Sequence, residues 1–281
     1  MINFEELANA VNPNPGQTLK TAPTPPAYTI PAKLLSKGTT NAKTSKNALE
    51  TFILYMSPAA QNSKAADLCP FRSKGCTAAC LYTAGRGKFN NVQRARMNKS
   101  EYFTRDKKTF LAQLSLELIA INKKQLKKGT KAAIRLNGTT DVDFLYLLKN
   151  RAGLDALQLE GLVFYDYTKD PHRVKRYAGT NYTLTFSRAE DNEPQALEIL
   201  KNSGIVSAVF AEKLPQFYKG FEVINGDQSD DLMIKAAAAA GVLKRTRKGQ
   251  GIILGLKAKG DAKKDTSGFV ITSHLNTGTN A

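Results

Sequence analysis

Three cysteines lie within twelve residues, and the chain of 281 residues has no others. They are Cys69, Cys76 and Cys80, in the spacing C-x6-C-x3-C. An odd number of crowded thiols does not suit a disulfide framework, which uses even numbers at wider spacing. Pro70 and Gly75 allow the intervening loop to fold back, and one helical turn would bring the sulfurs of Cys76 and Cys80 to the same face. The sequence therefore predicts one site shared by three thiolates.

Four kinds of chemistry fit such a site. A [4Fe–4S] cluster held by three cysteines agrees with the lack of a fourth thiol and leaves one iron open. Zinc needs four ligands, or three and a water, and both histidines are distant in sequence whereas Asp67 is near. A redox pair of Cys76 and Cys80 would leave Cys69 without a role, and buried inert thiols are the remaining alternative. We favour the [4Fe–4S] cluster and keep zinc as its alternative.

Basic residues follow the cysteines directly. Gly85 and Gly87 flank Arg86, which would let both backbone and guanidinium approach an anion, and Arg94 follows a few residues later. We predict Arg86 and Arg94 as cofactor-binding residues at the mouth of a cluster loop that spans 67–90. The alternative is a solvated basic loop.

Short β-type runs alternate with helical runs beyond residue 46, which predicts βαβ units with parallel strands. The predicted strands are 50–56, 131–136, 161–167, 181–187, 205–211 and 221–224. The predicted helices are 105–121, 142–149, 194–202 and 230–240. Runs 251–256 and 269–273 would form a hairpin at the sheet edge or the last barrel strands. We expect an α/β fold, namely a partial or full TIM-type (β/α) barrel at 46–273, with a doubly wound sheet as the alternative. An extended Pro/Thr/Lys-rich arm would occupy 1–45 and a tail 274–281.

Polar residues follow most of the predicted strands at their carboxyl ends, where α/β folds bind ligands. Turn chemistry alone would also place polar residues there. As walls that position a ligand and move protons, we predict the following residues: Asn137, Asp141, Asp166, Arg188, Glu212 and Asp227.

Three cysteines in the loop after the first strand of a (β/α) unit resemble the radical S-adenosylmethionine superfamily, over about 49–230. The resemblance implies that the open iron binds S-adenosylmethionine, that 137–141 contact its methionyl amine, and that Ser187 and Arg188 contact its ribose or carboxylate. The superfamily's usual spacing is C-x3-C-x2-C with an aromatic residue before the last cysteine, where this chain has Ala79. The run CPFRSKGCTAACLYTAGRG and residues 225–260 are also similar to proteins encoded by phages and prophages, a family that implies no particular activity.

The net charge is +17, and two segments account for all of it. Residues 86–131 carry 13 Lys and Arg against three acids, and residues 244–264 carry eight against one. This pattern favours nucleic acid or a phosphorylated substrate as partner, with a solvated lysine-rich surface as the alternative. The sequence has neither a membrane-spanning apolar run nor a secretory signal, so we expect a cytoplasmic protein. Two functions remain open: an enzyme with radical or sulfur-transfer (desulfurase) chemistry, or a nucleic-acid-binding protein stapled by zinc or a cluster.

Overall fold

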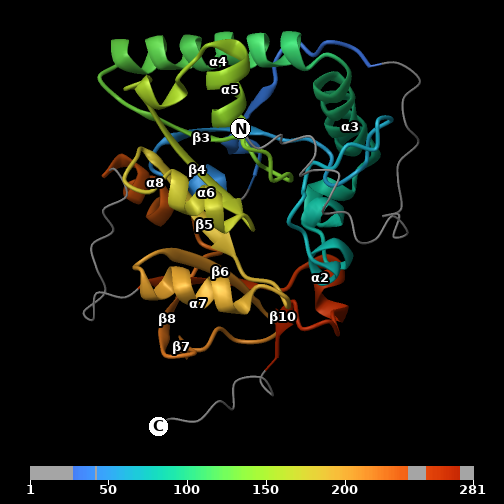
Figure 1. The fold of residues 1–281 in the computed structure, drawn as a ribbon, viewed down its shortest axis with the longest axis vertical. Coiled ribbons are helices and arrows are strands. Elements are labelled where there is room, and N and C mark those ends of the chain that lie inside the picture. The colour runs from blue at the N-terminus through green and yellow to red at the C-terminus, as the bar shows by residue number, and fades with distance from the viewer. Residues whose placement is uncertain (1–27, 42, 240–250, 273–281) are drawn as a thin grey trace.

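The structure, a computed structural model, describes residues 28–41, 43–239 and 251–272 (Figure 1). Most of the predicted arm, the first part of the second basic segment and the predicted tail at 274–281 lie outside the described residues. No described helix is long and apolar enough to cross a membrane.

A mixed ten-stranded sheet is the centre of the fold, with the order β1-β2-β3-β4-β5-β6-β9-β8-β7 and β10 beside β6. The strands are β1 Leu35–Lys37, β2 Glu50–Leu54, β3 Ala132–Arg135, β4 Leu162–Thr168, β5 Tyr182–Ser187, β6 Ile205–Phe210, β7 Phe217–Tyr218, β8 Phe221–Asn225, β9 Ile252–Lys257 and β10 Val270–Ile271. The pairs from β2 through β6 to β9 and β8 are parallel, whereas β1 and β7 pair antiparallel at the two edges. The carboxyl ends of the parallel strands therefore meet at one edge of the sheet.

Helices connect and cover these strands. They are α2 Lys74–Ala78, α3 Asn90–Arg105, α4 Lys107–Lys127, α5 Phe144–Ala152, α6 Pro171–Arg176, α7 Glu193–Lys201 and α8 Asp231–Ala238. Single 3₁₀ turns lie at Gly38–Thr40, Thr44–Lys46, Leu81–Thr83, Gly85–Lys88, Ala156–Gln158 and Gly260–Lys264. The predicted helix at 105–121 is confirmed as α4, although a break at Asp106 separates it from α3 and it continues to Lys127.

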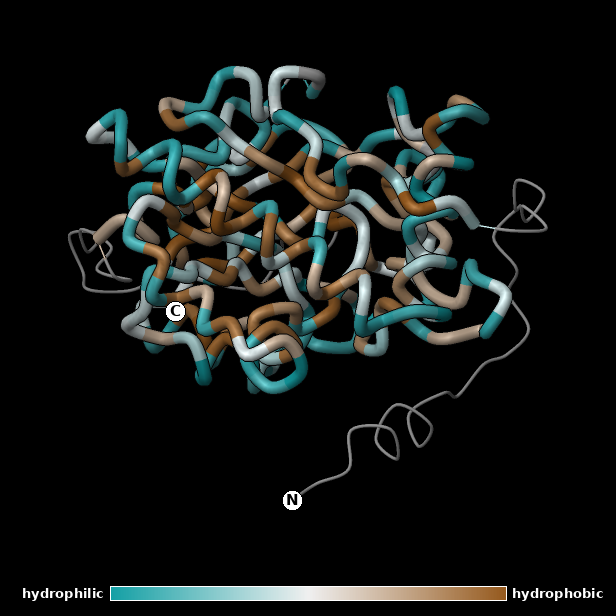
Figure 2. Tube along the Cα trace, turned by 90° about the horizontal axis from the view of Figure 1, so that it is seen from above, coloured by the Kyte–Doolittle hydropathy of each residue, from teal (hydrophilic) through white to brown (hydrophobic). Residues whose placement is uncertain are grey.

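Helices cover both faces of the sheet, so its strands are apolar on both sides. Alternate residues of β3 and β4 face opposite ways: Ile134 and Phe164 pack in the core with α4 and α5, whereas Ala133, Val163 and Tyr165 pack with α8. Figure 2 shows hydrophobic residues gathered inside the molecule and hydrophilic segments around them. Since α8 fills one face of the sheet, that face is buried without barrel closure.

The six predicted strands are all present, but one of the two alternatives given for the last two β-type runs is wrong. Runs 251–256 and 269–273 do not form a hairpin, because β9 runs parallel between β6 and β8, and β10 runs parallel beside β6. A hairpin would require two adjacent antiparallel strands. Within the range predicted as an arm, Leu35–Lys37 is an edge strand that pairs antiparallel with β2. The described residues form a mixed α/β fold, and the sheet at its centre is not closed.

Candidate three-cysteine site

A single cavity of about 1170 Å³ lies at the carboxyl ends of the parallel strands, and all three cysteines line it. It brings together most of the residues predicted from the sequence. Those that line it are Cys69, Cys76, Cys80, Arg86, Asn137, Asp141, Ser187, Arg188 and Asp227. Small-molecule pockets typically occupy about 300–1,000 Å³, so this cavity has room for a cofactor and a ligand together.

Three predicted site residues lie elsewhere. Arg94 is exposed on α3 and Glu212 is exposed after β6, and neither lines the cavity. Asp166 is fully buried behind the cavity wall. Position after a predicted strand was therefore a sufficient signal for most of the wall but not for Glu212, whereas Asp166 lies within the predicted strand 161–167.

The short helix α2 holds Cys76, and its first turn is tethered to the loop after β5. Ser73 caps the helix, because its Oγ accepts a hydrogen bond from Cys76 N at 3.0 Å. Glu190 then accepts hydrogen bonds from Ser73 Oγ at 2.8 Å and from Gly75 N at 2.7 Å. The carboxylate of Glu190 thus fixes the position of α2 against the sheet.

The three thiols are close enough to affect one another. Burial raises the pKa of Cys69 well above its usual range, and the sulfurs of Cys80 and Cys76 raise it further. Burial also raises the pKa of Cys80 to about 11. The expected helical turn joining Cys76 and Cys80 is wrong, because α2 ends at Ala78 and Cys80 follows its C-cap residue. Both nevertheless face the same cavity.

The loop after β3 holds the first part of the cysteine loop in place. Asp141 N donates to Leu68 O at 2.8 Å, and the Thr139 hydroxyl donates to Met56 O. Asn137 shapes this loop from within: its Oδ1 accepts hydrogen bonds from Val142 N at 2.8 Å and from Thr140 Oγ1 at 2.9 Å. Asn137 therefore positions the wall of the cavity, and its side-chain oxygen is already engaged.

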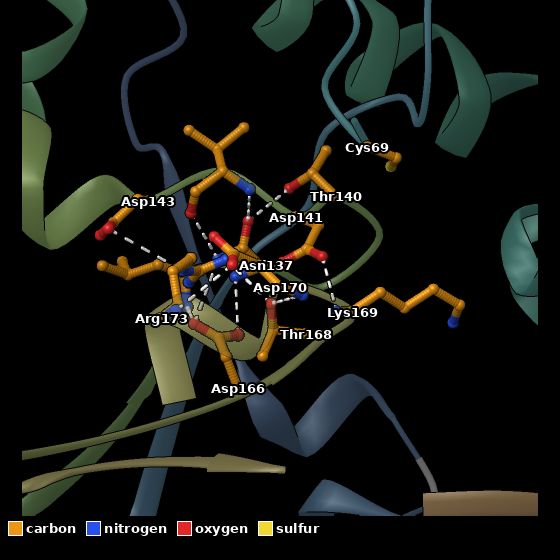
Figure 3. A network of polar contacts seen from close by, with 12 residues as sticks. Cys69, Asn137, Thr140, Asp141, Asp143, Asp166, Thr168, Lys169, Asp170 and Arg173 are labelled. Atoms are coloured by element: carbon orange, nitrogen blue, oxygen red, sulfur yellow. Dashed lines mark hydrogen bonds and ion pairs between the residues drawn. The ribbon is translucent and has the colours of Figure 1, made fainter. Parts of the chain in front are cut away.

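Asp166 is the hub beneath that wall (Figure 3). Its carboxylate accepts hydrogen bonds from Asn137 N at 2.8 Å, Leu136 N at 3.2 Å and Tyr182 Oη at 3.0 Å. Burial raises the pKa of Asp166 to about 6, although Arg135 and Arg173 oppose the rise. Asp166 thus positions the loop after β3 and does not line the cavity, where the sequence predicted it.

Asp141 is also engaged. It forms an ion pair with Arg173 Nη1 at 2.5 Å and accepts a hydrogen bond from Lys169 N at 2.9 Å. In Figure 3 the side chain of Lys169 extends away from this network, and its ammonium lies 5.5 Å from the centre of the Phe269 ring. Asp141 therefore ties the loops after β3 and β4 together.

Cationic side chains dominate the cavity lining. They are Lys43, Arg72, Arg86, Arg96, Lys99, Arg135, Lys169, Arg188, Lys257 and Lys259, against the acidic side chains of Asp141 and Asp227. Several are neutralised by carboxylates, such as Lys43 by Asp230 at 2.5 Å and Lys259 by Asp227 at 2.6 Å. Sequence reasoning missed the face of α3 that lines the cavity, although Val92, Ala95, Arg96 and Lys99 follow helical spacing.

The second part of the first basic segment lies away from the cavity. Exposed lysines occupy the end of α4 and the turn before β3, at the amino ends of the parallel strands: Lys123, Lys124, Lys127, Lys128 and Lys131. None of them lines the cavity. The positive charge of residues 86–131 is therefore divided between two separate regions.

Within the described part of the chain, no group of three or more His, Cys, Asp or Glu side chains is arranged to hold one metal ion. Asp67, the nearest acid to the motif in sequence, is paired with Arg72 and accepts a hydrogen bond from Cys69 N at 2.9 Å. Three thiols line the cavity, and thiolates can ligate zinc or, through separate irons, a [4Fe–4S] cluster.

Fold and site together define an α/β protein with a three-cysteine loop over a cationic cavity at the carboxyl edge of its sheet. The chain belongs to the gene product 88 family, whose model matches residues 33–273. This is a phage-type family, which confirms the expectation of a phage protein. No curated protein and no solved structure matches the chain.

Proposed function

We propose that the chain is an iron–sulfur enzyme in which Cys69, Cys76 and Cys80 hold a [4Fe–4S] cluster with one open iron. Its substrate would be a nucleotide or another phosphorylated molecule, bound in the host-cell cytoplasm. One observation carries the proposal: the three thiols and a strong excess of cations line the same cavity. The wall of that cavity is built from strand ends, where (β/α) barrels, open or closed, hold their ligands.

The donor set favours an open coordination position. No fourth cysteine exists, and His172 is exposed and does not line the cavity. When bound, the cluster would supply a redox-active centre whose open iron can coordinate a ligand. The resemblance to radical S-adenosylmethionine enzymes makes that cofactor one candidate ligand, and the substrate itself, for example a thiolated nucleobase, is the other.

The side chains of this chain would bind and orient the substrate. The networks of Asp141 and Asp166 fix the loops after β3 and β4, so the backbone that faces the cysteines is held in one geometry. Unneutralised cations of the wall would attract the phosphate groups. Such preorganisation lowers the entropy cost of bringing a substrate to the reactive centre.

The experiment is cluster reconstitution under anaerobic conditions, followed by visible spectroscopy and turnover assays. The wild-type chain should give a broad absorbance near 400 nm, and Cys76→Ala should lose most of it, whereas Thr77→Ala on the same helix should retain it. Release of 5′-deoxyadenosine would assign S-adenosylmethionine cleavage, and release of sulfide from a thiolated nucleotide would assign sulfur transfer. A wild-type chain that binds no cluster would refute the proposal.

A nucleic-acid-binding protein without catalytic activity is the second candidate, stapled by zinc or a cluster. The exposed lysines at the end of α4 favour it, because they lie apart from the cavity and could contact a phosphate backbone. Binding of this kind weakens steeply with salt. Salt-dependent binding that is lost when these lysines are replaced, with no turnover by reconstituted protein, would favour this candidate.

A further inference from the structure

One face of α3 lines the cavity and carries two cations, Arg96 and Lys99, three residues apart. The guanidinium of Arg96 lies between two tyrosine rings, with its carbon 4.8 Å from the centre of the Tyr55 ring and 5.5 Å from that of Tyr82. These two cation–π contacts stabilise the guanidinium at the wall of the cavity. Arg96 thus lies close to Tyr82, two residues after Cys80.

No carboxylate among the described residues neutralises Arg96. Its Nε and Nη1 are buried and have no hydrogen-bond acceptor there, and the buried Tyr82 Oη also lacks a partner. Burial lowers the pKa of Arg96. A charged group that is both desolvated and unpaired is costly, and an anion in the cavity would remove that cost.

Lys99 adds a second charge at the same place. Its side chain is nearly buried, and its ammonium donates to Leu34 O at 2.6 Å. The charge of Glu117 attracts Lys99, but the two oxygens of Glu117 accept hydrogen bonds from the backbone N–H groups of Leu34 and Leu35. Like charges at helical spacing destabilise a helix, so the pair has no evident structural benefit by itself.

We propose that Arg96 and Lys99 bind a phosphate dianion of the substrate, with Tyr82 Oη as an additional donor. Two cations on one wall match two negative charges better than the single charge of a carboxylate, and a planar guanidinium suits bidentate contact with phosphate. This inference deepens the proposed function and rests on the cavity being its substrate site. Phosphate binding can be measured whichever metal centre the cysteines hold.

The test is calorimetric binding of inorganic phosphate, adenosine monophosphate, adenosine and acetate to the full chain prepared anaerobically. Adenosine monophosphate should bind at least tenfold more tightly than adenosine, and phosphate more tightly than acetate. Arg96→Gln should weaken binding of the monophosphate about ten- to a hundredfold, the range expected for lost charge-assisted hydrogen bonds. Arg94→Gln is the matched control, because it removes the same charge from an exposed position on the same helix. It should change affinity less than twofold.

Circular dichroism of each variant establishes whether it folds, and Lys99→Gln replaces Arg96→Gln if the latter does not. Equal affinity for the monophosphate and adenosine, equal affinity for phosphate and acetate, or equal effects of Arg96→Gln and Arg94→Gln would each overturn the assignment. Iron and sulfide analysis of the same samples separates the two proposals. If the chain binds phosphate but no cluster, the iron–sulfur proposal is refuted and this inference stands. If it binds a cluster but no phosphate, this inference is refuted and the iron–sulfur centre stands.

Discussion

Replacing Glu190 with alanine should loosen the helix that carries Cys76. Glu190 Oε1 accepts the Gly75 N–H, and Oε2 accepts the Ser73 hydroxyl, which in turn caps Cys76 N. The variant Glu190→Ala removes both acceptors at once. The buried N–H of Gly75 would then lack a hydrogen-bond acceptor. The Ser73 hydroxyl, which caps the helix, would lose the carboxylate that accepts its hydrogen bond.

The magnitude follows from those two bonds. Hydrogen bonds to a charged group contribute about 1.5–3 kcal/mol each, and the partial exposure of Glu190 reduces this through competition with water. We expect a loss of about 2–4 kcal/mol in the free energy that holds the segment closed. Since about 1.4 kcal/mol corresponds to a factor of ten, amide exchange at Gly75 and Cys76 should become roughly a hundredfold faster.

Hydrogen–deuterium exchange of peptides that cover 69–80 measures this directly. Glu212→Ala is the control, because it removes the same charge from an exposed position that follows the next strand. It should leave exchange in 69–80 unchanged. If Glu190→Ala and Glu212→Ala give the same exchange rates there, the proposed tether of the cysteine helix is wrong.

Three further predictions concern the same framework. Gly75→Ala would place the new Cβ 2.6 Å from the Cβ of Phe269. Urea denaturation should therefore show a free energy of unfolding that is lower by about 2–3 kcal/mol. An unchanged free energy of unfolding would contradict this close packing. Asp166→Asn should lower the free energy of unfolding by about 3 kcal/mol in the same assay, because the buried carboxylate that accepts several hydrogen bonds loses its charge. A decrease of less than about 1 kcal/mol would refute the role of Asp166 as a positioning residue. Burial lowers the pKa of Lys99 from 10.5 to about 8, with Arg96 as its cationic neighbour and Glu117 opposing. Between pH 8 and 10.5 Lys99 therefore binds more protons in the unfolded chain than in the folded chain. The contribution of Lys99 to the free energy of unfolding should rise with pH over this range. The difference in unfolding free energy between wild type and Lys99→Met measures it, and a flat or falling difference would contradict the burial of a charged ammonium.

Most strands were predictable because their residues are buried on both faces. The runs at 161–167 and 205–211 are mostly apolar, and they form β4 and β6 at nearly the predicted positions. The place of β9 was not predictable, because an apolar run specifies a buried strand but not its neighbours. Only the long-range pairing of β9 with β6 and β8 excludes the hairpin.

The residues that line the cavity were predictable where they directly follow a parallel strand, because the strand ends meet at one edge of the sheet. Asp141 and Asp227 follow strands and do line the cavity, as expected. Asp166 fails this rule because it is the fifth residue of the seven-residue strand β4, where its side chain is covered by Tyr182 and the loop after β3. The predicted strand at 161–167 already contained Asp166, so its position within a strand, and not after one, was a signal in the sequence that it would be covered.

Arg94 was predicted as a site residue and Arg96 was given no role, for a different reason. Once α3 begins at Asn90, Arg96 and Lys99 share a face with Val92 and Ala95, whereas Arg94 points elsewhere. Helical spacing from Val92 would have identified Arg96. The stacking of Arg96 between Tyr55 and Tyr82 depends on two segments that meet only in the folded chain.

The central claim is that Cys69, Cys76 and Cys80 hold an open [4Fe–4S] cluster. Its most direct test is the iron, zinc and acid-labile sulfide content of the chain purified without oxygen. The account predicts about four iron and four sulfide per chain, both lost in Cys76→Ala. One zinc per chain with no sulfide would contradict it.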